Sequence, residues 1–143
     1  MRIERVISNK GAEVLTIAPN ASVGDAAILL SEKRIGAVVV CVPGEAPEGI
    51  LSERDIVREL GRSGAGCLQQ TVADLMTRDI RTCGLSDALD DVLSIMTEGR
   101  FRHMPVIADG QMVGIVSIGD IVKSRLNELS MERDALEGMV MGH

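Results

Sequence analysis

Apolar and polar positions along the chain predict one set of short elements, and that set occurs twice. In the first copy, residues 13–17 are expected to be extended. An apolar residue then recurs every three or four positions over 22–33, which predicts an amphipathic helix. An almost wholly apolar run, AVVVC at 37–41, is typical of a buried strand. After a turn at 43–49, a third strand leads into a helix that is expected to start at Ser52.

The second copy follows the same order. An extended segment is expected at 80–82 and an amphipathic helix over 87–98. The apolar run MPVIA at 104–108 predicts the buried strand, and a turn at 109–111 precedes the third strand. The next helix is expected to start at Ser117, so each copy has the order β-α-β-β-α.

The two copies also match residue by residue. Identical residues stand 66 positions apart in the first part of each copy, as in Thr16 and Thr82. Past the turn the separation is 65, as in Gly49 and Gly114, and the stretch GILSERD matches GIVSIGD. The one-residue change falls in a loop, where homologous segments tolerate insertions. We infer that the chain is a duplication.

The repeat predicts how the chain is divided. We expect a first repeat at 5–62, a linker and lead-in at 63–79, a second repeat at 80–125 and a tail at 126–143. The stretch GRSGAG at 61–66 has the composition of a flexible linker.

The tail is predicted to be helical, with an uneven apolar face. That face consists of Leu126, Leu129, Met131, Leu136, Met139 and Val140. Two interpretations are open, burial on the protein's own core or burial against a second subunit. We favour the subunit, because so long an apolar-faced helix has little core left to cover.

Composition and charge limit the classes of partner that the chain is expected to bind. With 45% hydrophobic and 25% charged residues, the chain has the composition of a soluble globular domain. A net charge of −6 disfavours nucleic acid and anionic membrane surfaces, since both require a basic face. One aromatic residue provides almost no stacking platform for single strands. No segment is long and apolar enough for a membrane span, and the N-terminal stretch lacks the apolar core of a signal peptide.

Three cysteines indicate the compartment. Cys41, Cys67 and Cys83 show no CxxC spacing and are odd in number, so neither a disulfide framework nor a zinc site is expected. A reducing, cytoplasmic location is therefore predicted. Cys41 ends an apolar run and is expected in the core, whereas Cys67 is expected to be an exposed thiol in the linker.

Three motifs together resemble a known family. They are VADLMT at 72–77 ahead of the second repeat, FRHMPV at 101–106, and the G-I-x-S-x-x-D that closes both repeats. With these the chain resembles a stand-alone tandem pair of CBS domains, the cystathionine-β-synthase-type regulatory modules. The resemblance implies an α/β fold, in which two βαββα halves pack through their sheets about a pseudo-twofold axis. It also implies two clefts that commonly hold adenine nucleotides, and a tendency to form homodimers.

The S-x-x-D motif has two compatible interpretations. A serine followed three residues later by an acid is a capping-box-like helix start. An ionised Asp at a strand-to-helix corner can also accept hydrogen bonds from both ribose hydroxyls, while the first-turn N–H groups suit an anion. Gly49 and Gly114 are expected to remove a side chain where a ligand approaches.

The resemblance implies two sets of ligand-binding residues, because each cleft combines one S-x-x-D with the first and second strands of the other repeat. The first cleft would contain Ser52, Arg54, Asp55, Thr82, Gly84, Arg102 and His103. The second would contain Ser117, Gly119, Asp120, Thr16, Ala18, Ile35, Gly36 and Ala37.

The two clefts offer different chemistry. Arg54 and Arg102 are permanently charged and His103 can titrate near neutral pH, so the first cleft suits a phosphate. The equivalent positions of the second cleft are Gly119, Gly36 and Ala37, so it can hold an adenosine but little charge. The alternatives are a solvated surface charge for Arg102 and a structural role for His103. AMP and NAD(H) are the favoured ligands and ATP is a further candidate.

A catalytic function is not expected. The two histidines cannot form a metal triad, no catalytic motif surrounds them, and neither GxGxxG nor a P-loop occurs. The predicted function is a non-catalytic adenine-nucleotide sensor that acts on an unidentified downstream protein. The alternative is a structural dimerisation module, in which both S-x-x-D motifs are only caps and the clefts are empty or filled by Met and Leu side chains.

Overall fold

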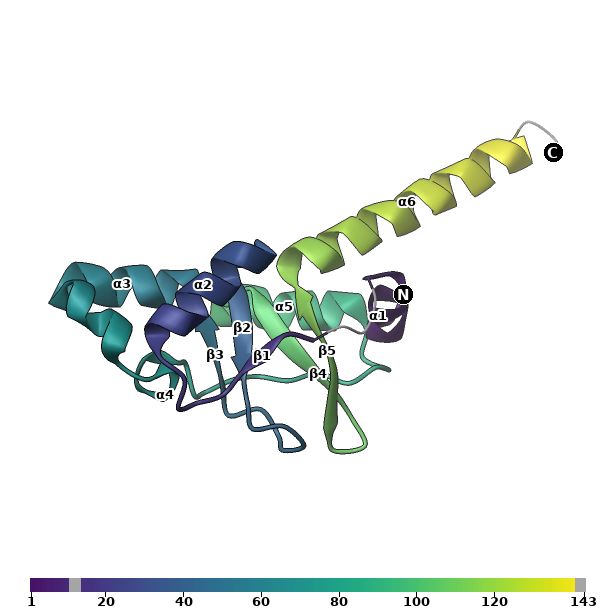
Figure 1. Cartoon of the computed structure of the whole chain (residues 1–143). Coiled ribbons are helices and arrows are strands. Elements are labelled where there is room, and N and C mark those ends of the chain that lie inside the picture. Colours follow the sequence, from purple (N-terminus) through teal and green to yellow (C-terminus); the bar gives the residue numbers. More distant parts are fainter. Residues whose placement is uncertain (11–13, 141–143) are drawn as a thin grey trace.

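The chain folds into two small α/β halves, as the repeat predicts (Figure 1). The structure, a computed structural model, describes residues 1–10 and 14–140. The first half has the elements β1 (Thr16–Ile17), α2 (Val23–Lys33), β2 (Ala37–Val40), β3 (Gly49–Ser52) and α3 (Glu53–Ser63). The second half has α5 (Leu89–Gly99), β4 (His103–Ala108), β5 (Gln111–Ser117) and α6 (Ile118–Val140). The predicted α/β fold is confirmed, and the first half has the predicted order of elements.

The first sheet is three-stranded, with the order β1-β2-β3. Strand β1 is parallel to β2 and places Thr16 opposite Val39, while β3 is antiparallel to β2 and places Ser52 opposite Ala37. All four residues of β2 are buried, which explains why this strand is apolar throughout.

The second sheet departs from the prediction, because residues 80–82 form no strand. Strands β4 and β5 pair antiparallel. In place of a third strand there is only an isolated parallel bridge between Cys83 and Val106. Cys83 N donates to the Pro105 carbonyl at 3.0 Å, and Ile107 N donates to the Cys83 carbonyl at 2.8 Å. The next bond of this ladder would need an N–H at Pro105, which proline lacks. At the equivalent place in the first repeat stands Val39, and there the strand forms.

Both second helices start at the predicted serine through a reciprocal cap. Ser52 N donates to Asp55 Oδ2 at 2.9 Å, and Asp55 N donates to Ser52 Oγ at 3.2 Å. Ser117 and Asp120 repeat this pair with 2.9 and 3.0 Å. The capping interpretation of S-x-x-D is therefore confirmed for both copies.

The predicted flexible linker is instead ordered helical structure. Helix α3 runs through Gly61 to Ser63, and a 3-10 helix, η1 (Ala65–Gln69), follows directly. The helix ends at Gly64, whose φ of 80° is a conformation that glycine adopts readily. The expectation of an exposed thiol here is wrong, since Cys67 is 1% exposed. A glycine-rich composition therefore marked a helix end rather than a mobile segment.

Two clusters of buried side chains form the core, one in each half. The first gathers around β2 and Leu51, and includes Val72 and Met76 of the lead-in that contains α4 (Val72–Leu75). The second gathers around β4 and β5. A helix that was not predicted, α1 (Ile3–Lys10), packs Ile3, Val6 and Ile7 into this second cluster. The N-terminal segment thus completes the core of the second half.

Helix α6 continues past the second half without a break, so the predicted tail helix and the helix that starts at Ser117 are one element. Figure 1 shows it projecting away from the two sheets, which lie in the middle of the molecule. Leu126 and Leu136 of its apolar face are exposed, which rules out burial on the protein's own core for these residues. No helix among the described residues combines the length and apolar character of a membrane span.

Candidate ligand-binding cleft

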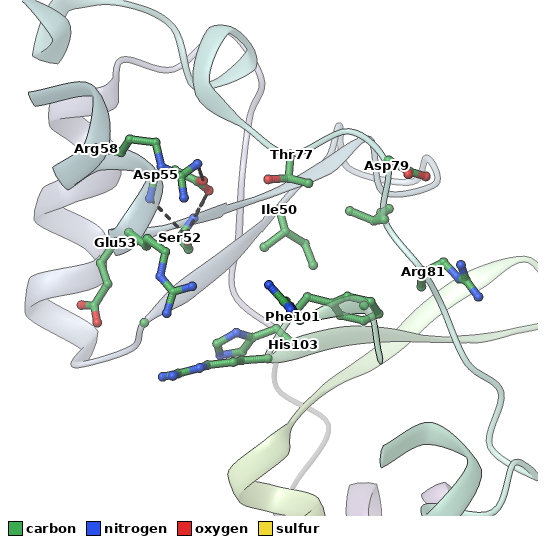
Figure 2. A pocket seen from close by; sticks show the side chains of 16 residues that line it. Ile50, Ser52, Glu53, Asp55, Arg58, Thr77, Asp79, Arg81, Phe101 and His103 are labelled. Atoms are coloured by element: carbon green, nitrogen blue, oxygen red, sulfur yellow. Dashed lines mark hydrogen bonds and ion pairs between the residues drawn. The ribbon is translucent and has the colours of Figure 1, made fainter. Parts of the chain in front are cut away.

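A cavity of about 490 Å³ lies where the two halves meet. One side is the corner between β3 and α3, and the other is the start of β4 with the connection that precedes it (Figure 2). Its lining consists of Gly36, Ile50, Ser52, Glu53, Arg54, Asp55, Arg58, Thr77, Asp79, Ile80, Arg81, Gly99, Arg100, Phe101, Arg102 and His103. Both repeats therefore contribute to one site.

Asp55 occupies the corner with one oxygen committed and one available. Its Oδ2 accepts from the Ser52 backbone N–H at 2.9 Å and from the Ser52 hydroxyl at 3.0 Å. Its Oδ1 has Arg58 at 4.0 Å, which is a weak ion pair (Figure 2). The carboxylate is largely buried, so the cap holds it in place while the second oxygen can accept from a ligand.

Arginines dominate the charge of the cleft. Five line it, namely Arg54, Arg58, Arg81, Arg100 and Arg102. The carboxylates on the same lining are Glu53, Asp55 and Asp79. Within residues 1–10 and 14–140, only Arg58 of these five forms an ion pair. A cationic cleft in a chain of net charge −6 is suited to an anion.

One wall of the cleft is apolar. Phe101, the single aromatic residue of the chain, lies there with Ile50 and Ile80. The ring approaches the end of α5 so closely that a Cβ on Gly99 would overlap Phe101 Cε1. Helix α5 ends at Arg100, in the left-handed conformation with φ 58°. This arrangement places an apolar surface beside cationic side chains.

Most residues predicted for the first cleft come together. Ser52, Arg54, Asp55, Arg102 and His103 all line it. Gly36, which the resemblance assigned to the second cleft, lies on it as well.

Two predicted residues are elsewhere on the same connection. Thr82 and Gly84 are not part of the lining, and Gly84 N instead donates to Asp87 Oδ2 at 2.8 Å in a local turn. Their role in binding stays a prediction. The residues that the connection contributes lie a few positions earlier, namely Thr77, Asp79, Ile80 and Arg81.

Sequence reasoning missed several lining residues. Arg58 lies one helical turn beyond Arg54 and could have been found from that spacing. Thr77 reaches the cleft through a bridge to Ile50, in which each N–H donates to the other's carbonyl at 3.0 and 2.9 Å. No local pattern predicts that long-range pairing.

The motif glycines make room for the chain itself rather than for a ligand. A Cβ on Gly49 would stand 2.7 Å from the Thr77 carbonyl oxygen and 2.8 Å from Met76 Sδ. A Cβ on Gly114 would stand 2.6 Å from Ile7 Cδ1. The expectation that these glycines face a ligand is wrong, because the lead-in of each repeat fills that space.

The second predicted cleft is only partly described. Ser117 and Asp120 cap α6, with Gly119 between them. Thr16 lies on β1 with Ala18 just after it, and Ile35 precedes Ala37 at the start of β2. By the 66-residue offset, the counterparts of 77–79 are residues 11–13, which lie outside the described residues. The second set therefore stays a prediction.

The Cys83 thiol lies on the same connection, beyond the residues that line the cleft. Burial, and to a lesser degree the charge of Asp87, raises the pKa of the Cys83 thiol to about 12. This thiol is protonated at neutral pH, and the thiolate is the nucleophilic form. Among the described residues, no group of three or more His, Cys, Asp or Glu side chains could hold a metal ion.

Comparison with known proteins gives the family. The model of the CBS domain matches residues 6–62 and 72–127. The mitochondrial CBS domain-containing protein CBSX3 of Arabidopsis thaliana is 32% identical, over 98% of this chain and 72% of its own length.

Solved structures agree. That of a CBS-domain containing protein from Agrobacterium tumefaciens is 42% identical with a TM-score of 0.84, over 87% of this chain and 99% of its own. The CBS domain pair of protein MJ0100, solved with 5′-methylthioadenosine and S-adenosyl-L-methionine, is 22% identical with a TM-score of 0.78, over 90% and 98% of the two chains. Since the CBS model accounts for both halves, this chain belongs to the CBS-domain family and carries two CBS domains in tandem.

Proposed function

We propose that this protein is a non-catalytic sensor that binds an adenine nucleotide in the cleft between its two CBS domains. The observation that carries the proposal is the convergence of five arginines and the capped carboxylate of Asp55 on one cavity. A nucleotide has the complementary parts, namely an anionic phosphate and a ribose whose two hydroxyls donate to a carboxylate.

The proposed placement follows the chemistry of the walls. Asp55 accepts from the ribose hydroxyls through its available oxygen, and the base lies against the apolar wall at Phe101. Arg54 and Arg102, helped by His103, neutralise the phosphate. The solved CBS pair of protein MJ0100, in complex with 5′-methylthioadenosine and S-adenosyl-L-methionine, supports the adenosine part of the proposed ligand.

The charge of the cleft ranks the ligands. AMP and NAD(H) present phosphate to the arginines and are favoured, and ATP is a further candidate. S-adenosylmethionine shares the adenosine but carries a cationic sulfonium, which the same arginines repel. The protein is proposed to report ligand binding to a downstream protein rather than to transform the ligand.

The competing proposal is a structural dimerisation module without a physiological ligand. It predicts a cleft that is empty in solution or filled by Met and Leu side chains. The described lining contains neither residue type, which favours the sensor.

A calorimetric titration of the purified protein separates the two proposals. AMP, adenosine, NAD⁺, ATP and S-adenosylmethionine are titrated at the same ionic strength. We expect AMP to bind more tightly than adenosine, and S-adenosylmethionine to bind more weakly than AMP. If the protein binds none of the five, the structural module is correct.

We also propose that the protein is a cytoplasmic homodimer. Exposed apolar side chains on the repeat helices, such as Ile28, Val57 and Leu60, supply contact surface. Light scattering at micromolar concentration should give twice the chain mass of 15.3 kDa, and a monomer mass rejects the claim. The Arabidopsis relative is named as mitochondrial, so cell fractionation is the test of location.

A further inference from the structure

Helix α6 is far longer than its contact with the body of the protein. It spans 23 residues, which corresponds to about 34 Å. Its first turns are anchored, since Ile121 is fully buried, Arg125 pairs with Asp90 at 3.7 Å, and Glu128 pairs with the Met1 amino group at 3.5 Å. Beyond Glu128 the helix projects from the body for about another 18 Å (Figure 1). A helical segment this short is marginal in water without tertiary packing.

The projecting helix carries an apolar seam. Val122, Leu126, Leu129 and Leu136 are 41%, 61%, 46% and 62% exposed. They are spaced by four, three and seven residues. Arg133 divides the last interval, since it lies four residues after Leu129 and three before Leu136. This is the alternating four-and-three spacing of a coiled-coil seam. The seam faces a different side of the helix from the anchored residues, because successive residues are turned by about 100°.

We infer that this seam pairs with the seam of a second copy of the chain, with the two α6 helices antiparallel. A parallel pair is opposed by the charges. It would place Arg133 against Arg133 of the second copy within the apolar seam, and Glu132 beside Glu137 of the second copy at its edge. Like charges in those positions repel each other.

The antiparallel pair removes the Arg133 conflict from the seam, and at the edge it replaces the two Glu132–Glu137 contacts by a single Glu132–Glu132 contact near the twofold axis. With its centre near residue 131, it places Leu126 opposite Leu136 of the second copy, and Arg133 opposite Leu129. At the edge, Lys123 then lies beside Glu137 of the second copy, and twofold symmetry forms this pair twice. The charge pattern therefore selects both the occupant, a second copy, and its direction.

The pairing has a structural connection to the cleft. The first N–H of α6, from Ile118, donates to the Arg102 carbonyl at 2.9 Å, and Arg102 lines the cleft. The inference rests on the proposed self-association and does not depend on nucleotide binding.

A disulfide experiment on the full chain tests the arrangement. The native cysteines are all buried, so introduced thiols respond first to mild oxidation. The double variant Leu126→Cys/Leu136→Cys is expected to form a covalent dimer in non-reducing gels. Leu126→Cys alone is expected to give at least tenfold less, because two copies of residue 126 stand about 15 Å apart in the antiparallel pair, beyond disulfide reach.

Two matched substitutions by glutamate, one inside the seam and one outside it, then test the seam. In the double-cysteine background, Leu129→Glu should lower the yield of covalent dimer at least tenfold. Met131→Glu should leave it unchanged, because Met131, which is 61% exposed against 46% for Leu129, faces the opposite side of the helix.

Each outcome has a defined meaning. Equal cross-linking by Leu126→Cys alone, no cross-linking by the double variant, or equal effects of the two Glu substitutions would overturn the inference. A dimer by light scattering without cross-linking rejects this α6 arrangement and leaves the self-association intact. A monomer rejects both and leaves nucleotide binding untouched.

Discussion

Asp55 combines two roles at the level of a single residue. Its Oδ2 holds the first turn of α3 through the Ser52 N–H and hydroxyl, and its Oδ1 is directed by that same cap. Capping and ligand binding are therefore compatible at this residue, because they use different oxygen atoms. The equivalent Asp120 forms the same cap at α6, so it provides a natural comparison.

Replacing Asp55 by Ala should weaken AMP binding in the cleft about thirtyfold or more. The variant loses a charged acceptor for two hydroxyls, worth roughly 2–3 kcal/mol. Asp120→Ala is the control, because it removes the equivalent cap and leaves the lining of this cleft intact. Calorimetry measures both variants after thermal denaturation has confirmed that each is folded. An AMP affinity of Asp55→Ala within threefold of the wild type would refute the assignment.

Because of Cys83, the free energy of unfolding is expected to fall as the pH becomes alkaline. Its raised pKa of about 12, against an ordinary value of 9.0, means that the folded state holds this proton more tightly than the unfolded state. The stabilisation is complete below pH 9 and is lost as the pH rises from 9 to 12. The slope is at most about 1.4 kcal/mol per pH unit.

Cys83→Ala should flatten this alkaline decline. Urea unfolding of the wild type and the variant at pH 8, 10 and 11 gives the two slopes directly. Identical slopes would show that the thiol does not contribute.

At the scale of elements, local pattern and long-range contact determine different parts of the fold. Helices α2 and α5 and strands β2 and β4 follow from hydrophobic spacing, because their buried faces are continuous in the sequence. Helix α1 has the same spacing in Ile3, Val6 and Ile7 but was not predicted, and its place in the core depends on partners such as Leu89 and Ile121, which lie far along the chain. The missing strand at 80–82 depends on Pro105, a residue of its partner strand.

The packing of Met76 and Thr77 against β3 should be sensitive to a single added methyl group at Gly49. Gly49→Ala places a Cβ 2.7 Å from the Thr77 carbonyl oxygen, so the segment that contains Thr77 must shift. We expect a loss of about 1–3 kcal/mol in the free energy of unfolding, as for overpacked cores.

Gly61→Ala is the matched control. This glycine lies inside α3 with nothing within 4 Å of the added Cβ, so the substitution should stabilise by about 0.5–1 kcal/mol. Urea unfolding measures both variants. Equal effects of the same sign would contradict the proposed close packing at Gly49.

For the whole molecule, the cleft exists only because two repeats meet. The S-x-x-D motif identified Ser52 and Asp55 from the sequence, and the family resemblance added Arg54, Arg102 and His103. The remaining arginines required the fold. Arg58 comes from α3, Arg81 from the connection and Arg100 from the end of α5. Their convergence gives a local positive charge in an acidic chain, which neither composition nor any single motif predicts.

Calorimetric titration of AMP and adenosine into the wild type and Arg102→Ala measures how much the cleft binds through the phosphate, because the two ligands differ by the phosphate alone. We expect the wild type to bind AMP more tightly than adenosine. Arg102→Ala should lose at least tenfold in AMP affinity and less than threefold in adenosine affinity. Arg62→Ala, which removes an exposed arginine of α3 outside the lining, should change neither. Equal losses for both ligands would refute the phosphate role of Arg102, and a wild type that binds neither would refute nucleotide binding.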